Sequence, residues 1–386
     1  MAPPPPVLMD ELIEEILLHF PPDHPASLVR AGLVCRSWQR IVSDPSFARR
    51  FREFHFKLGF FYNFKDDQTG ADIVRFVPTS TCPALADRRN SRALDARHGR
   101  VLLHDTTQAA PPPPGPPGRL VVWDPVTDEQ RDLPLPPGHL YRNCTAWNAA
   151  VLCAAVADGG GACDHLGCHG GPFLIVLSCI VGDAAYFFLY SSITGSWSKP
   201  SEVVYLNQYP GAARDVVGPS LLIGGTLHFL AGHEILTYDL AGNNKQPWLF
   251  TSPFSGMRNM ALVATTEEGD GRGGLGLGAA VVREGSVRLY SNLHGLAGWK
   301  EEKGGFIGLE AGANTLVAFA EGLDAVLVIT EKGGISMHEL KSGRITEVCE
   351  TGLHCDGAIV PYVRFCLPGS STGPHSSQPA KMNLGN

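Results

Sequence analysis

The sequence predicts a multidomain protein of class α plus all-β, in which a short helical domain precedes a β-propeller. Three observations predict it. Apolar residues at helical spacing are confined to a segment that ends near Phe54. Beyond it, apolar runs of strand length are bounded by Gly, Pro, Asn or Asp. Several of these runs recur in one form about every 50 residues, as the blades of propellers do.

The expected domain boundaries follow from these changes in pattern. They are a flexible tail at 1–7, a helical domain at 8–52, a β-propeller at 53–368 and a disordered tail at 369–386. Six blades are favoured, while seven or eight blades, or two stacked β domains, remain compatible with the pattern.

The composition excludes several classes of function. With 44% hydrophobic and 18% charged residues, 44 Gly and 30 Pro, the chain suits short strands joined by tight turns. A net charge of −7 gives no reason to expect a nucleic-acid partner. The longest apolar run, Phe173 to Val181, is shorter than the roughly 18 residues of a membrane span, and the first residues lack the features of a secretory signal. We expect a cytoplasmic and/or nuclear protein, without a membrane partner or a structural disulfide among its ten cysteines.

The N-terminal segment predicts three or four short amphipathic helices. Its first helix carries apolar residues at Leu8, Leu12, Ile13, Ile16 and Leu17, opposite an acidic face, and should end at the prolines 21–22. A second helix should begin near residues 25–26 and run through "SLVRAGLVC", and "SWQRIV" should form a third. In "SDPSFARRF" the aspartate can cap a fourth helix.

A helical domain of this size is marginal on its own, so its apolar residues must complete their burial elsewhere. One interpretation is a cap that packs on the rest of the chain. The other is a docking surface for a partner protein. Residues expected in the core of the domain itself are Ile13, Leu33, Val42, Phe47 and Phe51.

The order of motifs in this segment resembles the F-box. It reads Leu-x-x-Glu-Leu-x-x-Glu-Ile-Leu, then Pro-Pro, then Leu-Val-Arg-Ala-x-Leu-Val-Cys-Arg-Ser-Trp, then Ile-Val-Ser-Asp-Pro-x-Phe. The variant is similar to that of the large F-box families of grasses, which continue into a Phe-rich strand, as "FREFHFKLGFFYNF" does here. The resemblance implies binding to a Skp-family adaptor and, through it, to cullin and RING subunits of a ubiquitin ligase.

The resemblance also implies which residues face the adaptor. By position these are Leu8, Met9, Leu12, Ile16, Leu17, Leu28, Val29, Val34, Cys35, Trp38 and Ile41. One departure is Met9, where the family usually has proline. Methionine keeps an adaptable apolar contact but makes the helix entry less rigid.

The repeat in the remaining chain predicts the blade count. Five segments share a strand that ends in an aromatic residue or His, followed by a polar turn and a short return strand. Their anchors are Trp123, Tyr190, Tyr238, Tyr290 and His338, and the intervals between successive anchors are 67, 48, 52 and 48 residues. The Gly-rich segment 158–171 is an apparent insertion of 14 residues, and 67 − 14 = 53.

One period before Trp123 lies "DIVRFVP", near Ile73, which makes six units. The last strand, "AIVPYVRFCLP", should then pair with the first blade and close the ring, which removes the exposed sheet edges. The turn "WDPVT" with "LPLPP" behind it resembles the kelch-like propellers that follow plant F-boxes. The Pro-rich segment 109–119 is expected to be a loop between two strands.

No motif in the sequence carries an enzyme's chemistry. The cluster Cys163, Asp164, His165, Cys168 and His169 lacks the spacing of a zinc finger or ribbon, so no metal is expected. The Gly-x-Gly-x-x-Gly match at 269–274 is followed by strand-like residues instead of a helix, which indicates a hairpin loop. His residues at 228, 233 and 338 lie in or beside strands, and His104, beside Asp105, has no nucleophile nearby in the sequence.

These observations lead to one functional expectation. The protein is expected to be the non-catalytic substrate-recognition subunit of a Skp–cullin–F-box ubiquitin ligase, with no cofactor, whose propeller binds an unknown protein target. The alternative is a propeller enzyme or a lectin-like binding protein with a helical N-terminal cap.

Overall fold

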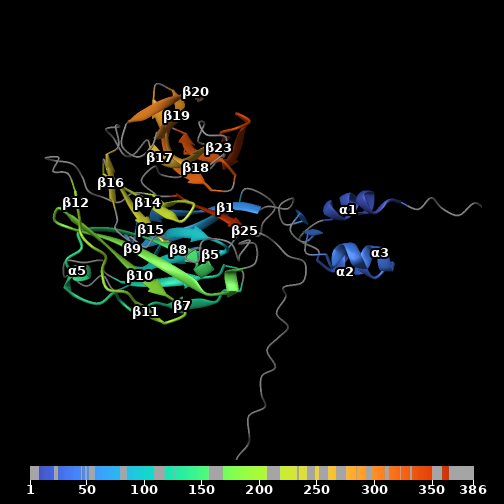
Figure 1. The fold of residues 1–386 in the computed structure, drawn as a ribbon, viewed down its shortest axis with the longest axis horizontal. Coiled ribbons are helices and arrows are strands. Elements are labelled where there is room, and N and C mark those ends of the chain that lie inside the picture. The colour runs from blue at the N-terminus through green and yellow to red at the C-terminus, as the bar shows by residue number, and fades with distance from the viewer. Residues whose placement is uncertain are drawn as a thin grey trace, which may run out of the picture. The chain divides into compact units, whose positions relative to one another are not determined.

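The structure is a computed structural model of the 386-residue chain (Figure 1). It describes residues 8–20, 25–44, 46–47, 50–51, 57–78, 85–107, 118–125, 127–155, 168–206, 218–232, 234–240, 248–251, 260–266, 275–283, 285–292, 298–308, 313–321, 323–330, 333–349 and 359–364. The chain divides into two compact units, which are treated separately below. The first is Met1–Phe56 with Phe365–Asn386, and the second is Lys57–Arg364.

The first unit is helical. It contains α1 (Asp10–Leu18), α2 (Pro25–Gly32) and α3 (Arg36–Val42), followed by helical residues at 46–47 and 50–51. The carboxylate of Asp44 accepts a hydrogen bond from the Ser46 N–H at 2.8 Å, as a helix cap does. This bond lowers the pKa of Asp44.

The helix predicted to run through Cys35 ends earlier, at Gly32. The backbone turns at Leu33 and Val34, and Cys35 is extended, with φ −159° and ψ 168°. Glycine in a helix costs about 1 kcal/mol relative to alanine, so a helix end here is cheap. The turn removes Leu33 from the inward face, and its side chain is 78% exposed. The prediction that Leu33 belongs to the core is therefore wrong.

The helical unit has a small core of its own. Its buried members are Ile13, Leu17, Leu18, Leu28, Ala31, Ile41, Phe47 and Phe51, with Phe20, Trp38 and Val42 partly buried against them. Of the remaining residues predicted for this core, Ile13, Phe47 and Phe51 are confirmed, and Val42 packs at its margin. The unit buries one side of each helix, which leaves the other side available.

The second unit is a six-bladed β-propeller, as predicted. Its described strands form six antiparallel sheets, one for each blade. Blade 1 comprises β25 (Ile359–Arg364), β1 (Lys57–Lys65), β2 (Asp72–Pro78) and β3 (Arg88–Arg89). Blade 2 comprises β4 (Ser91–Arg97), β5 (Arg100–Asp105), β6 (Arg119–Trp123) and β7 (Gln130–Asp132). Blade 3 comprises β8 (Ala146–Cys153), β9 (Phe173–Val181), β10 (Ala184–Ser191), β11 (Ser196–Trp197) and β12 (Val204–Tyr205). Blade 4 comprises β13 (Leu221–Ile223), β14 (Thr226–Ala231), β15 (Glu234–Asp239) and β16 (Trp248–Thr251). Blade 5 comprises β17 (Met260–Thr266), β18 (Leu275–Arg283), β19 (Ser286–Asn292) and β20 (Trp299–Gly308). Blade 6 comprises β21 (Ala313–Ala320), β22 (Ala325–Thr330), β23 (Ile335–Glu339) and β24 (Ile345–Cys349).

Short helical elements interrupt this pattern. Among the described residues they include α5 (His139–Arg142), before blade 3, and the 3₁₀ turn η2 (Cys168–Gly170), inside it. No helix among the described residues combines the length and the apolar character needed to cross a membrane.

The repeat seen in the sequence corresponds to one strand of each blade. Trp123, Tyr190, Tyr238, Tyr290 and His338 all lie in the third strand of their sheets, near its end. Ile73 also lies in a third strand, β2, although at its beginning. The long first interval contains the connection 154–172 between β8 and β9, whose residues 156–167 lie outside the described part of the chain.

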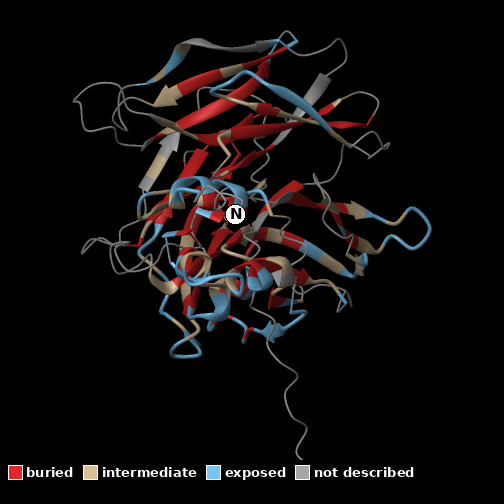
Figure 2. Ribbon diagram, turned by 90° about the vertical axis from the view of Figure 1, so that its right-hand side faces the viewer, coloured by how far each residue is buried: buried red, intermediate tan, exposed pale blue. Residues whose placement is uncertain are grey.

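The ring is closed by the last strand, as predicted. β25 pairs with β1 from Lys57↔Arg364 to Tyr62↔Ile359, so blade 1 is built from both ends of the unit. The first strands of neighbouring blades face one another: β25 contacts β4 and β21, and β4 contacts β8. Figure 2 shows buried residues along the strands of this unit and exposed residues mostly in its turns.

An aromatic cluster fixes the closure. The Phe61 ring of β1 lies 5.3 Å from the Tyr362 ring of β25 and 5.7 Å from the Trp123 ring of blade 2, measured between ring centroids. All three side chains are buried. Edge-to-face pairs of this kind contribute about 0.5–1.5 kcal/mol each beyond the burial of apolar area.

We predict that Tyr362→Ala destabilises the propeller by roughly 3 kcal/mol, because it opens a cavity at the closure. Urea unfolding monitored by tryptophan fluorescence measures this. Tyr205→Ala is the matched control, since Tyr205 is 70% exposed on β12. Equal effects of the two substitutions would contradict the importance of the closing strand.

Candidate functional site

The exposed large apolar side chains of the described residues are concentrated in the helical unit. Of twelve such residues, seven lie there, although the propeller is several times larger. We call these seven the exposed apolar set: Leu8, Met9, Leu12, Ile16, Val29, Leu33 and Val34. The other five, in the propeller, are Leu135, Ile193, Val203, Tyr205 and Ile345.

Helix α1 contributes Leu12 and Ile16 to this set because it has two apolar faces; the other members precede α1 or lie in α2 and the turn after it. Ile13 and Leu17, four residues apart, point into the core of the unit. Leu12 and Ile16 have the same spacing on the adjacent face and are 48% and 45% exposed. A helix that is apolar on both faces needs a second surface to cover it.

Polar contacts hold α1 so that the second face stays outward. The Ser37 hydroxyl of α3 donates to the Asp10 carboxylate at 2.7 Å, and Arg40 pairs with the same carboxylate. Arg50 donates to Glu14 at 2.5 Å. These pairs are exposed, so their contribution to stability is small, but they fix the rotation of α1 about its axis.

The structure divides the predicted adaptor-facing residues into two groups. Leu8, Met9, Leu12, Ile16, Val29, Val34 and Cys35 are exposed. Leu17, Leu28 and Ile41 are buried in the core of the unit, and Trp38 is half-buried against that core. Sequence reasoning missed Leu33 as a surface residue, and Gly32 before it was the signal that could have found it.

A comparison with protein families identifies this unit. Residues 10–53 match the F-box-like family. The chain therefore carries an F-box-like domain, followed by a six-bladed β-propeller. F-box domains in general bind Skp-family adaptors.

No curated protein matches the chain. Among solved structures, it resembles apo AztD from Citrobacter koseri, with 11% identity and a TM-score of 0.35 over 80% of this chain and 98% of that one. A post-proline cleaving enzyme from Rickettsia typhi matches with 9% identity and a TM-score of 0.32 over 77% of this chain and 45% of that one. An oligogalacturonate lyase in complex with manganese matches with 10% identity and a TM-score of 0.34 over 75% and 84%. Likenesses this low carry no argument about function.

The weaker motifs of the sequence fall as follows. Cys163, Asp164 and His165 lie outside the described residues, and so does the Gly-rich segment 267–274. That segment connects β17 to β18, which pair antiparallel with Thr266 opposite Leu275, so the prediction of a hairpin is confirmed. The Pro-rich segment likewise connects β5 to β6. His233 is not described, and the other three candidate histidines are buried.

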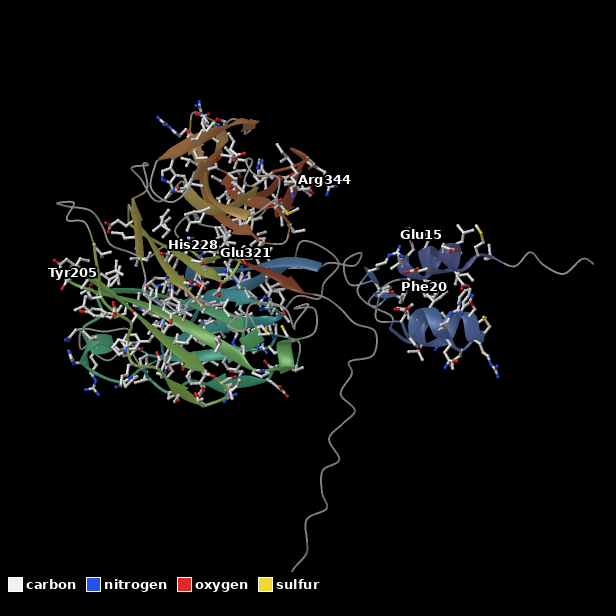
Figure 3. All side chains as sticks on the ribbon, viewed as in Figure 1. Glu15, Phe20, Tyr205, His228, Glu321 and Arg344 are labelled. Atoms are coloured by element: carbon white, nitrogen blue, oxygen red, sulfur yellow. The ribbon has the colours of Figure 1, made fainter. Side chains whose placement is uncertain are left out.

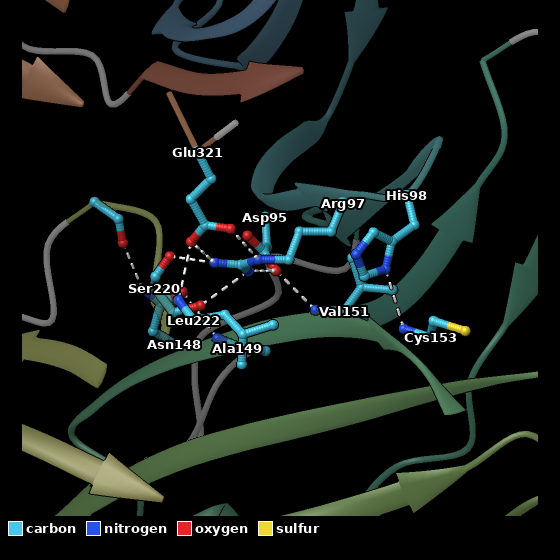
Figure 4. A network of polar contacts seen from close by, with 11 residues as sticks. Asp95, Arg97, His98, Asn148, Ala149, Val151, Cys153, Ser220, Leu222 and Glu321 are labelled. Carbon is cyan, nitrogen blue, oxygen red and sulfur yellow. Dashed lines mark hydrogen bonds and ion pairs between the residues drawn. The ribbon is translucent and has the colours of Figure 1, made fainter. Parts of the chain in front are cut away.

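A buried polar network near the inner strands is the propeller's strongest alternative site (Figure 4). At its centre is the guanidinium of Arg97, at the end of β4. It donates to both carboxylate oxygens of Glu321, at 3.0 and 2.6 Å, and to the Ser220 hydroxyl at 3.1 Å. It also pairs with Asp95 and bonds to the Ser220 carbonyl. The partners come from blades 2, 4 and 6.

The two carboxylates extend this network to the backbone. Asp95 accepts from the Val151 N–H at 2.8 Å, and Glu321 from the Leu222 N–H at 2.9 Å. Burial raises the pKa of Asp95 to about 6, against the opposing effects of Arg97 and the Val151 N–H. Because the carboxylates are engaged by the guanidinium and by backbone N–H groups, the network joins several blades of the propeller.

We predict that Arg97→Met destabilises the propeller by about 3–5 kcal/mol, because it leaves the buried Asp95 unpaired. Arg344→Met is the control, since Arg344 forms an exposed pair with Glu339 at the end of blade 6. Urea unfolding should show a large loss for the first variant and almost none for the second. A small loss for Arg97→Met would show that the network is dispensable.

His228 gives the propeller a pH dependence. It is buried in β14, its Nδ1 has no partner, and it lies near Glu321 (Figure 3). Burial lowers the pKa of His228 to about 4. The unfolded ring titrates near 6.5, so between these values the unfolded state binds more protons and stability falls as pH falls. Burial lowers the pKa of His338 as well, so this histidine also makes the propeller less stable as the pH falls.

We predict that His228 alone removes about 2 kcal/mol of stability between pH 7 and pH 5. Urea unfolding of the wild type and of His228→Gln at both pH values measures this contribution. Because Asp95 titrates in both proteins, the difference between them isolates the histidine. The same loss in both proteins would contradict the prediction.

Proposed function

We propose that the protein is the substrate-recognition subunit of a Skp–cullin–F-box ubiquitin ligase. The observation that carries the proposal is the F-box-like match at residues 10–53 together with the exposed apolar set on the same unit. A Skp-family adaptor would cover Leu12, Ile16 and Val34, and with them the predicted Leu8, Met9, Val29 and Cys35. Cullin and RING subunits would follow through the adaptor.

The buried members of the predicted set have a supporting role in this proposal. Leu17, Leu28 and Ile41 form the core against which α1 rests, so they hold the outward face of the helix in place. Trp38 is half-buried and can serve both surfaces. Substituting these residues would disturb folding and docking together, which makes them poor probes of docking.

The propeller would bind the target protein. In this role the protein catalyses no bond change itself. It holds the target near a ubiquitin-loaded enzyme carried by the same complex, which raises the effective concentration of the target's lysines. We further propose that the propeller is of the kelch-like kind found in plant F-box proteins, that it spans residues 53–368, and that the protein acts in the cytoplasm and/or nucleus. The "WDPVT…LPLPP" turn supports the kelch-like assignment.

We predict that Ile16→Asp in the full-length protein weakens binding to a purified Skp-family adaptor roughly 100-fold. The substitution forfeits about 2–3 kcal/mol of apolar burial and places a charge in the contact. Isothermal titration calorimetry measures the affinity, and circular dichroism checks that the helices remain. Ile193→Asp is the matched control, because Ile193 is 72% exposed on the propeller and should not affect adaptor binding.

A pull-down under proteasome inhibition extends the test to the whole ligase. The wild type and Ile193→Asp should recover cullin and RING subunits, and Ile16→Asp should not. If the folded wild type does not bind the adaptor at micromolar concentration, the proposed function is wrong and the alternative of a propeller enzyme or lectin with a helical cap takes its place.

A further inference from the structure

Arg100, the first residue of β5, is a buried cation that forms no ion pair with a carboxylate among the described residues. Only 2% of its surface is exposed. Its Nη2 donates to the carbonyl of Gly171 at 2.6 Å and to the carbonyl of Cys168, while its Nη1 is buried and has no partner. In the part of the chain that the structure describes, no carboxylate forms an ion pair with this guanidinium.

The neutral contacts around Arg100 compensate its charge only in part. Its guanidinium lies 5.5 Å from the centroid of the Phe173 ring, and Arg131 lies 5.4 Å from the same centroid. A cation–π contact stabilises a buried cation by less than its burial without a counter-charge costs. A second cation next to the ring makes the need for a negative group greater.

Two cysteines border this cation. Cys168 lies in η2, and its carbonyl accepts a hydrogen bond from Arg100; the residue is partly exposed and is in no disulfide. Cys153 ends β8, is buried, and pairs across the sheet with Phe173. Burial lowers the pKa of Arg100, while Cys168 and then Cys153 raise it, each more than Asp124 does. Of the two thiols, only that of Cys168 can be reached by a reagent from solvent.

We propose that Cys168 is a reactive thiolate that serves as the counter-charge of Arg100 and is a modification site for soft electrophiles and peroxides. Partly exposed thiols beside a fixed cation are the reactive ones in proteins.

With an alkyl iodide the sulfur forms a bond to carbon, the carbon–iodine bond breaks and iodide leaves. With a peroxide the sulfur attacks one oxygen, the O–O bond breaks and hydroxide leaves. This second step oxidises the sulfur by two electrons to a sulfenic acid.

The charged and titratable groups that act on Arg100, in β5, come from several elements. Cys168 lies in η2, Asp124 follows β6, and Cys153 lies in β8, where its N–H donates to His98 Nδ1 at 3.3 Å. Arg100 is the group whose contacts join the turn of Cys168 directly. The pH dependence of labelling should therefore respond to changes at position 100.

The test is the rate of iodoacetamide labelling of the full-length protein at pH 8.5 and pH 6.5, resolved for each cysteine by peptide mass spectrometry. An ordinary thiol titrates near 8.5, so its rate should fall about 50-fold between these pH values. Cys35, which is exposed on the helical unit, is the internal reference. We expect the Cys168 rate to fall less than about fivefold, since a thiolate fixed by Arg100 persists at the lower pH.

Two variants separate the charge of Arg100 from its other roles. Arg100→Gln should make the Cys168 rate fall as steeply as that of Cys35, whereas Arg100→Lys, which keeps a cation, should preserve the shallow dependence. Buried Cys144 must stay unlabelled in both variants, which shows that the blades remain folded. If Arg100→Gln unfolds, the wild type still decides: parallel pH dependences of Cys168 and Cys35 overturn the proposal. A shallow dependence retained in folded Arg100→Gln overturns it as well. None of these outcomes depends on adaptor binding.

Discussion

The buried guanidinium of Arg97 is the contact on which the arrangement of the propeller most depends. One side chain from blade 2 is bonded to Glu321 from blade 6 and to Ser220 from blade 4, and its partner Asp95 is bonded to the backbone of blade 3. Buried charges such as those of Arg97 and Asp95 are tolerated only when they are paired, and the partly exposed Glu321 gives Arg97 a second carboxylate partner. The pairing exists only when these blades stand around one centre, so the network favours the closed ring over partly assembled sheets.

Ring closure likewise requires that the two ends of the propeller unit come together. Because β25 pairs with β1, blade 1 is incomplete until residues from 57–65 and 359–364 meet. The aromatic cluster of Phe61, Trp123 and Tyr362 forms only at that point, and it also fixes blade 2. Contacts between such distant parts of the chain are slow to form. We therefore expect ring closure to come late in folding, when β25 pairs with β1 and removes the open sheet edges.

The sequence predicted the repeat and much of the helical unit, but not the network. The period was visible because Trp123, Tyr190, Tyr238 and Tyr290 occupy one structural position, the end of the third strand. Asp95, Arg97 and Glu321 could not be connected, since 224 residues separate the last two. The pairing of β4 with β5 is irregular between Ala93 and Asp95. Such a bulge redirects side chains, so the alternation of buried and exposed residues along β4 does not predict that Asp95 points inward. In the helical unit, the spacing of the apolar residues predicted both apolar faces of α1. It did not predict which face the core of the unit would bury.

The two units use buried and exposed surface in opposite ways, and this contrast argues for a division of roles. Among its described residues, the propeller buries the charged pair of Asp95 and Arg97 and exposes few large apolar side chains for its size. The helical unit completes a core of its own around Leu17 and still exposes Met9, Leu12 and Ile16. Since a completed core cannot draw these residues inward, their exposure is stable only if another surface covers them. In the proposed function, a Skp-family adaptor would provide that surface. The turns of the propeller would then bind the target.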